Sequence, residues 1–121
     1  MGYEISISED GKYVIVEVLE TVTWELAKNF MADSLIAINA HGLEKVLVDV
    51  SKVQNQASIF ENYKLAYEEA TIQGVSLDLE IVVLVGFDDK SHDFIETVFR
   101  NAGYKCKICR DKDSAIEMIK K

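Results

Sequence analysis

The sequence predicts an α/β domain built on one mixed, mostly parallel sheet with packed helices. Alternating apolar and polar residues near the N-terminus predict a β-hairpin. Two short, nearly continuous apolar segments, 46–50 and 81–85, are typical of strands that are covered on both faces. Segments with helical spacing separate and follow these strands. With 121 residues, of which 49% are hydrophobic and 28% charged, the chain is expected to form a single domain, 1–121.

The N-terminal segment predicts an antiparallel hairpin. Residues 3–8 alternate between apolar and polar side chains, which indicates a strand with one buried face at the edge of the sheet. Asp10 and Gly11 form a hairpin-turn signal, and the more apolar segment 13–18 returns as the second strand. Because the edge strand is exposed, either a monomer or a homodimer is expected.

The next segment changes to helical spacing. Thr23 is a candidate N-cap, and Gly42 is suited to the residue that ends a helix. His41 lies just before that end, where a positive charge suits the helix dipole. Segment 46–50 then predicts a buried parallel strand. The apolar stripe of the helix consists of Trp24, Ala27, Phe30, Met31, Ser34, Leu35 and Ile38.

A second helix has a clear predicted start, because Ser58 and Glu61 have the spacing of a capping box. Gly74 is suited to its end, and the apolar segment 81–85 predicts the most buried strand, expected at the centre of the sheet. The inner stripe of this helix is predicted to be Phe60, Tyr63, Tyr67 and Ala70.

The C-terminal part predicts another helix, a strand and a last helix. Asp89 or Ser91 is the candidate cap of the third helix, and residues 104–109 form the final strand. Lys105 and Lys107 predict one solvated face of that strand. The element order is therefore β-β-α-β-α-β-α-β-α, with right-handed crossovers. The remaining expected positions are the apolar residues Phe94, Ile95, Val98, Phe99 and Ala102, the helix end Gly103, the caps Asp111 or Asp113, and the last stripe Ala115, Ile116 and Ile119.

The charge and hydropathy of the chain limit which kinds of partner and which cellular location are expected. The net charge of −8 argues against nucleic acid or an anionic membrane as the main partner, because both require a basic surface. No apolar segment approaches the ~20 residues that cross a bilayer, and the N-terminus lacks a basic region followed by an apolar one. The sequence therefore predicts a cytoplasmic protein that binds another protein.

Cys106 and Cys109 have the CxxC spacing of redox and metal sites. In an extended strand, however, residues three apart point to opposite faces, and the sequence offers no second pair of zinc ligands. Both are expected to be ordinary thiols, with no metal or other cofactor.

Three segments together resemble STAS or SpoIIAA-like domains, in particular the divergent SpoIIAA-like, STAS/SEC14-type branch. They are LVDVSKV at 47–53, NQASIF at 55–60 and ICRDKDSAIEMIKK at 108–121, and the shared element order extends the resemblance over nearly the whole chain. The resemblance implies a SpoIIAA-like fold and a non-enzymatic regulatory module similar to anti-sigma factor antagonists.

The resemblance also implies a candidate regulatory phosphorylation site at Ser58. Laid on this chain from Asp49, the family pattern DLSxxxxxDSSG places its phosphorylated serine there. Ala57, Ile59 and Phe60 replace the pattern's neighbouring aspartate, second serine and glycine, which argues against regulation by a cognate kinase. Serine is also a favoured N-cap whatever the function. The surface expected to contact a protein partner consists of Gln54, Asn55, Gln56, Ala57 and the outward-facing Glu61 and Asn62.

Two other classes of function stay open. One is a small carrier that holds an apolar molecule or lipid in a pocket between helix and sheet. The other is a metal-assisted enzyme at Asp88, Asp89 and His92, although these residue types are also typical of a helix start. No phosphate loop, GxSxG or HExxH motif is present. The pocket of the carrier would be lined by Trp24, Phe30, Phe60, Tyr63 and Tyr67.

Overall fold

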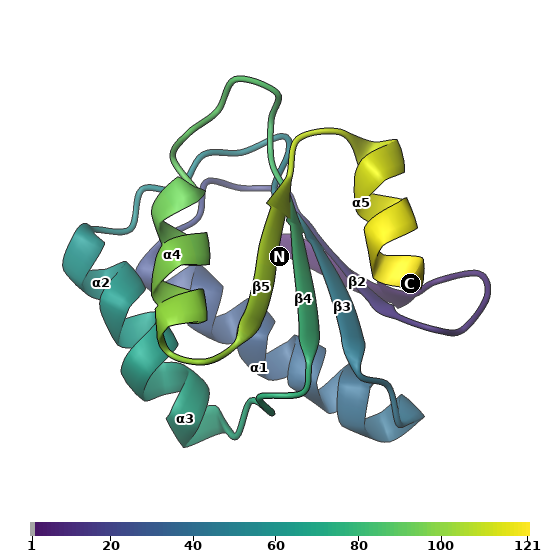
Figure 1. Ribbon diagram of the computed structural model, residues 1–121. Coiled ribbons are helices and arrows are strands. Elements are labelled where there is room, and N and C mark those ends of the chain that lie inside the picture. The colour runs from purple at the N-terminus through teal and green to yellow at the C-terminus, as the bar shows by residue number, and fades with distance from the viewer. Residues whose placement is uncertain (1) are drawn as a thin grey trace.

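The computed structural model, which describes residues 2–121, contains one five-stranded sheet in the order β1-β2-β3-β4-β5 (Figure 1). β1 pairs with β2 antiparallel, and every later pair is parallel. This confirms the predicted α/β class and the mixed, mostly parallel sheet. The strands are β1 (Tyr3–Ile7), β2 (Val14–Val18), β3 (Lys45–Asp49), β4 (Glu80–Leu84) and β5 (Lys105–Cys109).

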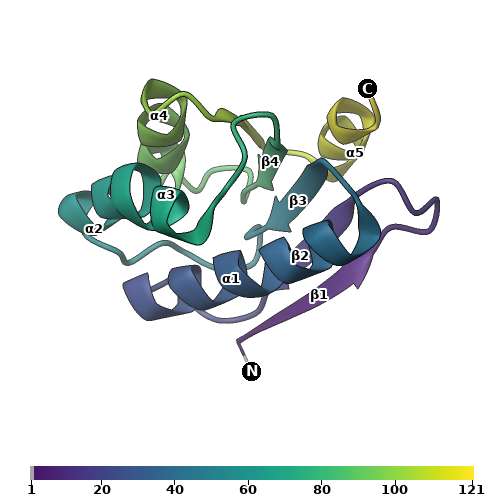
Figure 2. The ribbon, with the colours of Figure 1, turned by 90° about the horizontal axis from the view of Figure 1, so that it is seen from below.

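The helices cover the two faces of the sheet unequally. α5 lies alone on one face, and the other helices pack on the opposite face (Figures 1 and 2). A large apolar core fills the space under the latter, and a smaller one, which includes Ala115 and Ile119, lies under α5. The helical segments are α1 (Trp24–His41), α2 (Ile59–Lys64), η1 (Leu65–Glu69), α3 (Ala70–Gln73), α4 (Asp93–Asn101) and α5 (Lys112–Lys120).

The position of the most buried strand was predicted wrongly. β4 is internal, but it lies between β3 and β5, and the middle of the sheet is β3. Each crossover adds the next parallel strand on the same side of the previous one, so the spatial order follows the chain order. The apolar segment 81–85 reflects that β4 is covered on both faces of the sheet, and the same holds for β3.

Most predicted helix ends are confirmed. The Thr23 hydroxyl accepts a hydrogen bond from the Leu26 N–H at 3.2 Å, and Gly42 ends α1 with a φ of 63°. The Asp111 carboxylate accepts hydrogen bonds from two backbone N–H groups at the start of α5. The cap predicted for α4 is wrong: this helix begins at Asp93 without a side-chain cap, because the Asp89 and Ser91 side chains bond within and between loops instead.

The predicted inner stripe of the second helix is also wrong, except for Ala70. Phe60 is 68% exposed, Tyr63 48% and Tyr67 37%. A set with the same helical spacing, Asn62, Leu65, Ala66 and Ala70, is buried in their place. α2 and α3 are joined through the π-helical turn η1, and along this helix small residues face inward where it packs against α1 and α4. The large aromatic side chains therefore face solvent.

The two cysteines lie on opposite faces of β5, as their spacing predicts. Cys106 belongs to the large core and Cys109 to the core under α5, and both thiols are free. Burial raises the pKa of the Cys106 thiol to about 12, with a smaller contribution from Glu96. Burial also raises the pKa of Cys109.

Because the pKa values of these thiols are raised, we expect the free energy of unfolding to fall at alkaline pH. The pKa of Cys106 is higher in the native state than in the unfolded chain, so the native state binds this proton more tightly. The contribution of the Cys106 thiol to the free energy of unfolding is therefore fully present below about pH 9 and is lost as the pH rises toward 12. The hydrogen bond to Asp33 raises the pKa of Tyr3 to about 12 and acts in the same direction. Urea unfolding at about pH 8 and pH 10.5 measures the decline. Cys106→Ala should make it shallower; an equal decline would contradict this account.

Candidate functional site

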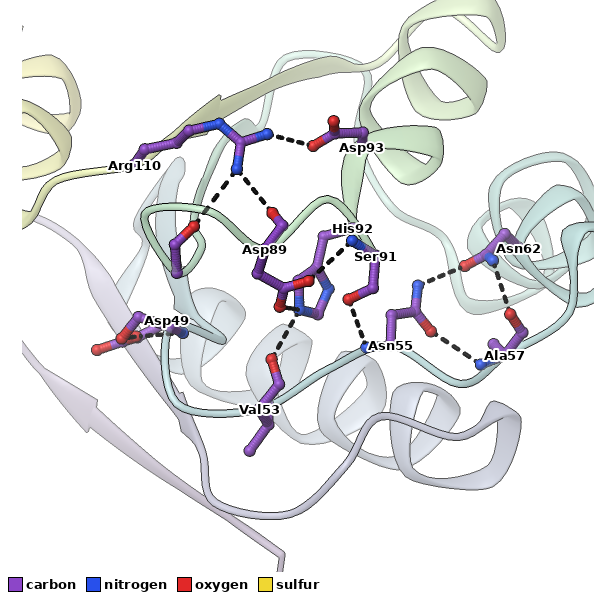
Figure 3. Close-up of polar contacts among 12 residues, drawn as sticks. Asp49, Val53, Asn55, Ala57, Asn62, Asp89, Ser91, His92, Asp93 and Arg110 are labelled. Carbon is purple, nitrogen blue, oxygen red and sulfur yellow. Dashed lines mark hydrogen bonds and ion pairs between the residues drawn. The ribbon is translucent and has the colours of Figure 1, made fainter.

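The candidate site lies at the carboxyl ends of the parallel strands, where α/β sheets commonly bind ligands. Three loops meet there: 19–23 after β2, 50–58 after β3 and 85–92 after β4 (Figures 1 and 3). The Val22 N–H donates to the Gln54 carbonyl, and the Gln56 N–H donates to the Val22 carbonyl, both at 2.8 Å. The predicted partner-binding loop is therefore fixed through its backbone, while the side chains of Gln54 and Gln56 are exposed.

Two side chains join the loop after β3 to the loop after β4 (Figure 3). The Asn55 N–H donates to the Ser91 hydroxyl at 2.9 Å. The Nε2 atom of His92 lies 3.0 Å from the Val53 carbonyl oxygen, and the His92 residue is only 3% exposed. Because buried polar groups are costly unless hydrogen bonded, these contacts hold both loops in one arrangement.

Asn62 anchors the end of the partner-binding loop from within the second helix. Its side-chain amide donates to the carbonyls of Ser58, at 2.9 Å, and Ala57, at 3.3 Å. Its Oδ1 atom accepts from the Asn55 amide at 3.1 Å, and Asn55 Oδ1 accepts from the Ala57 N–H at 3.0 Å. Asn62 was expected to face outward, which is wrong: it is 6% exposed. Its hydrogen bonds to the loop explain why a polar residue is buried there.

Ser58 and Glu61 form the predicted capping box at the start of α2. The Ser58 hydroxyl accepts from the Glu61 N–H at 3.1 Å, and the Glu61 carboxylate accepts from the Ser58 N–H at 2.9 Å. Ser58 is exposed. Its hydroxyl is therefore open to solvent at the positive end of the helix, while the Glu61 carboxylate is engaged by the backbone.

Four large apolar side chains form an exposed surface next to this cap, which we call the α2 apolar surface. The rings of Tyr63 and Tyr67 stack with their centroids 4.4 Å apart. The Lys64 ammonium lies 5.6 Å from the centre of the Phe60 ring, so a cation borders the surface. The surface consists of Ile59, 72% exposed, with Phe60, Tyr63 and Tyr67.

The aspartate-rich segment does not form a metal site. Asp88 is exposed, whereas Asp89 accepts from the Ser91 N–H at 2.8 Å and lies 3.5 Å from His92 Nε2. Burial alone would raise the pKa of Asp89, but hydrogen bonds from Ser91 and the charges of His92 and Arg110 hold it below its ordinary value. Within residues 2–121 no three His, Cys, Asp or Glu side chains converge in a way that could hold a metal ion.

Arg110 fastens the same segment from the end of β5. Its guanidinium donates to the Asp89 carbonyl at 2.6 Å and to the Gly86 carbonyl at 3.3 Å, and pairs with the Asp93 carboxylate at 2.5 Å (Figure 3). The aspartate-rich segment and Arg110 thus hold the loop after β4 in a fixed conformation. This role was missed in the sequence because Arg110 lies far from the aspartates along the chain.

An apolar cavity of about 110 Å³ lies between the sheet and the helices α1, α2 and α4. Trp24 and Phe30, two of the five residues predicted to line a carrier pocket, contribute to its wall. Phe60, Tyr63 and Tyr67 do not line it, which corrects the predicted lining: these rings face solvent. Residues from β3 and β4, including Val48 and Val83, complete the wall.

Comparison with known proteins identifies the class of fold. A crystal structure of an uncharacterized protein from Shewanella loihica PV-4, of the DUF3478 family and with a SpoIIAA-like fold, matches 97% of this chain and 91% of its own. The TM-score is 0.58 and the sequence identity is 17%. The chain therefore has a SpoIIAA-like fold, as the resemblance implied. No protein-family model and no curated protein matches the sequence.

No helix among residues 2–121 combines the length and the apolar character that a membrane span needs.

Proposed function

We propose that the protein is a non-enzymatic regulatory module that binds a protein partner, as anti-sigma factor antagonists do. The observation that carries the proposal is the α2 apolar surface beside the fixed loop Gln54–Ala57. Four large apolar residues with exposed fractions between 37% and 72% lie together on one helix. Contiguous exposed apolar surface of this kind marks interaction sites in proteins.

The residue types favour a protein partner. Aromatic side chains such as Phe60 and Tyr63 bury large areas on binding and are common among residues that dominate interface energies. The hydrogen bonds of Asn55, Asn62 and Ser91 fix the adjoining loop before binding, which lowers the entropy cost of association. The net charge of −8 favours a partner with a basic rim around an apolar centre.

Ser58 is the residue whose phosphorylation would regulate partner binding. A phosphate there would meet free backbone N–H groups at the helix start, so the helix tolerates it. It would also place about two negative charges next to Ile59 and Phe60, where a partner has to be desolvated. Modification of Ser58 would therefore release the partner without unfolding the domain.

Ser58→Asp is expected to keep the helix cap and to abolish capture of the partner. Aspartate is as good an N-cap as serine, but it introduces charge at the binding surface. Affinity capture from lysate, quantified by mass spectrometry against the wild type, measures the loss. Ser58→Ala is the control: it should lower the free energy of unfolding by about 1 kcal/mol yet retain the partner. Equal capture by Ser58→Asp and wild type would rule out this surface.

A small-molecule carrier is the second candidate, and the apolar cavity favours it. Its volume of about 110 Å³ is well below the ~300 Å³ of ordinary ligand pockets, so it suits a small apolar molecule rather than a whole lipid. A native mass spectrum of the purified protein tests this candidate. Extra mass of a small apolar compound would support the carrier, and a bare chain would leave the protein-binding module.

A further inference from the structure

The two edges of the sheet differ in how they are protected. On β5 the outward N–H of Ile108 donates to the Glu96 carboxylate at 2.7 Å, and the exposed Lys105 and Lys107 flank it. Side chains of this kind are common protection against pairing with another chain. β1 contains neither lysine nor proline, and within residues 2–121 only β2 pairs with it. Figure 2 shows β1 at the outer border of the molecule.

The hairpin register shows which backbone groups of β1 face outward. The Leu19 N–H donates to the Gly2 carbonyl at 2.7 Å, and the Ser8 N–H donates to the Tyr13 carbonyl at 2.9 Å. Hydrogen-bonded positions alternate along an antiparallel pair, so the even-numbered residues of β1 bond to β2. The N–H and C=O groups of Tyr3, Ile5 and Ile7 therefore point away from the sheet.

We propose that this edge pairs with β1 of a second copy of the chain, antiparallel and centred on Ile5. In that register Ile5 faces the partner's Ile5, and Tyr3 faces the partner's Ile7. Each facing pair of outward residues exchanges two backbone hydrogen bonds. The result is one continuous sheet of ten strands, five from each copy.

Charge selects this register over its neighbours. Glu4 and Ser6 alternate with the outward residues, and centring on Ile5 places Glu4 opposite the partner's Ser6. A shift that centres the pair on Glu4 would set two carboxylates directly opposite each other, which is destabilising. A shift toward Ile7 would leave Tyr3 unpaired. Only the register centred on Ile5 pairs all five residues of β1 and avoids the like-charge contact.

The side chains are consistent with a second copy as the occupant. Tyr3, Ile5 and Ile7 lie on the face covered by α1, and the two isoleucines are only half-buried. In the proposed pair each of these side chains has an apolar neighbour across the new seam. The apolar area that β1 leaves open would therefore be covered.

Opposite charges at Ser6 test both the pairing and its register. Ser6 is exposed and lies in the closely spaced, non-hydrogen-bonded position of the proposed pair. Ser6→Lys should tighten the dimer by about 2- to 30-fold, because two Lys–Glu4 pairs form per dimer; Ser6→Glu should weaken it by a similar factor. Sedimentation velocity over a range of concentrations measures the dissociation constants, and thermal unfolding checks that each variant is folded.

The same charges at Thr71, which is exposed on α3, provide the matched control for the change in net charge. The expected result is a concentration-dependent dimer that Ser6→Lys and Ser6→Glu shift in opposite directions, and by more than the Thr71 variants do. A wild type that stays monomeric at millimolar concentration would overturn the proposal. Ser6 variants that behave like the Thr71 variants would also overturn it.

Discussion

Phe60→Ser combined with Tyr63→Ser is expected to weaken binding of the captured partner by about 30-fold or more. Phe60 is 68% exposed and Tyr63 48%, so a partner bound at the proposed surface would contact both rings. Truncating aromatic residues at the centre of an interface commonly costs about 2 kcal/mol or more. Titration calorimetry with the purified partner measures the affinity.

The fold should be unaffected by this pair of changes, because substitutions of exposed residues usually change stability by less than about 0.5 kcal/mol. Ile36→Ser is the matched control, since Ile36 is also 68% exposed but lies on α1. It should bind the partner like the wild type. If Ile36→Ser weakens binding as much as the double change does, the effect is one of general surface hydrophobicity, and the assignment of the surface fails.

Asn62→Ala is expected to lower the free energy of unfolding by about 2 kcal/mol, because it removes three side-chain hydrogen bonds to partly buried groups. The Asn55 amide and the carbonyls of Ala57 and Ser58 lose their hydrogen bonds to Asn62. The loop Gln54–Ala57 should also become mobile. Urea unfolding measures the stability, and amide hydrogen exchange at Asn55 and Ala57 measures the loop.

Asn29→Ala is the control for the loss of an asparagine, because Asn29 is exposed on α1. It should leave both stability and loop exchange unchanged. Equal effects of the two substitutions would contradict the anchoring role of Asn62. A stability loss without faster exchange in the loop would show that Asn62 supports the helix rather than the loop.

Local signals explain why much of the fold could be predicted. The caps at Thr23, Ser58 and Asp111 each depend on backbone N–H groups two or three residues away, so the sequence contains both partners. The hairpin turn and the glycine ends likewise depend on neighbouring residues. The strands were recognisable because covered strands need continuous apolar residues.

The candidate site could not be predicted in full, because it depends on contacts between residues that are far apart in the sequence. Along 59–73 two sets of residues share the helical period, and only the space against α1 and α4 selects Leu65 and Ala66 for the interior. Ser91 resembles a helix cap locally, yet its hydroxyl accepts from Asn55, 36 positions away. The orientation of the aromatic residues, and thus the α2 apolar surface, could therefore be known only from the structure.

Site-specific photo-crosslinking tests the central claim most directly. A benzophenone side chain at position 63, on the α2 apolar surface, is compared with one at position 36 on α1, both irradiated in lysate. The account predicts a covalent adduct to one protein from position 63 and none from position 36, with the position-63 adduct lost in Ser58→Asp. Adducts of equal yield from both positions, or an adduct only from position 36, would contradict it.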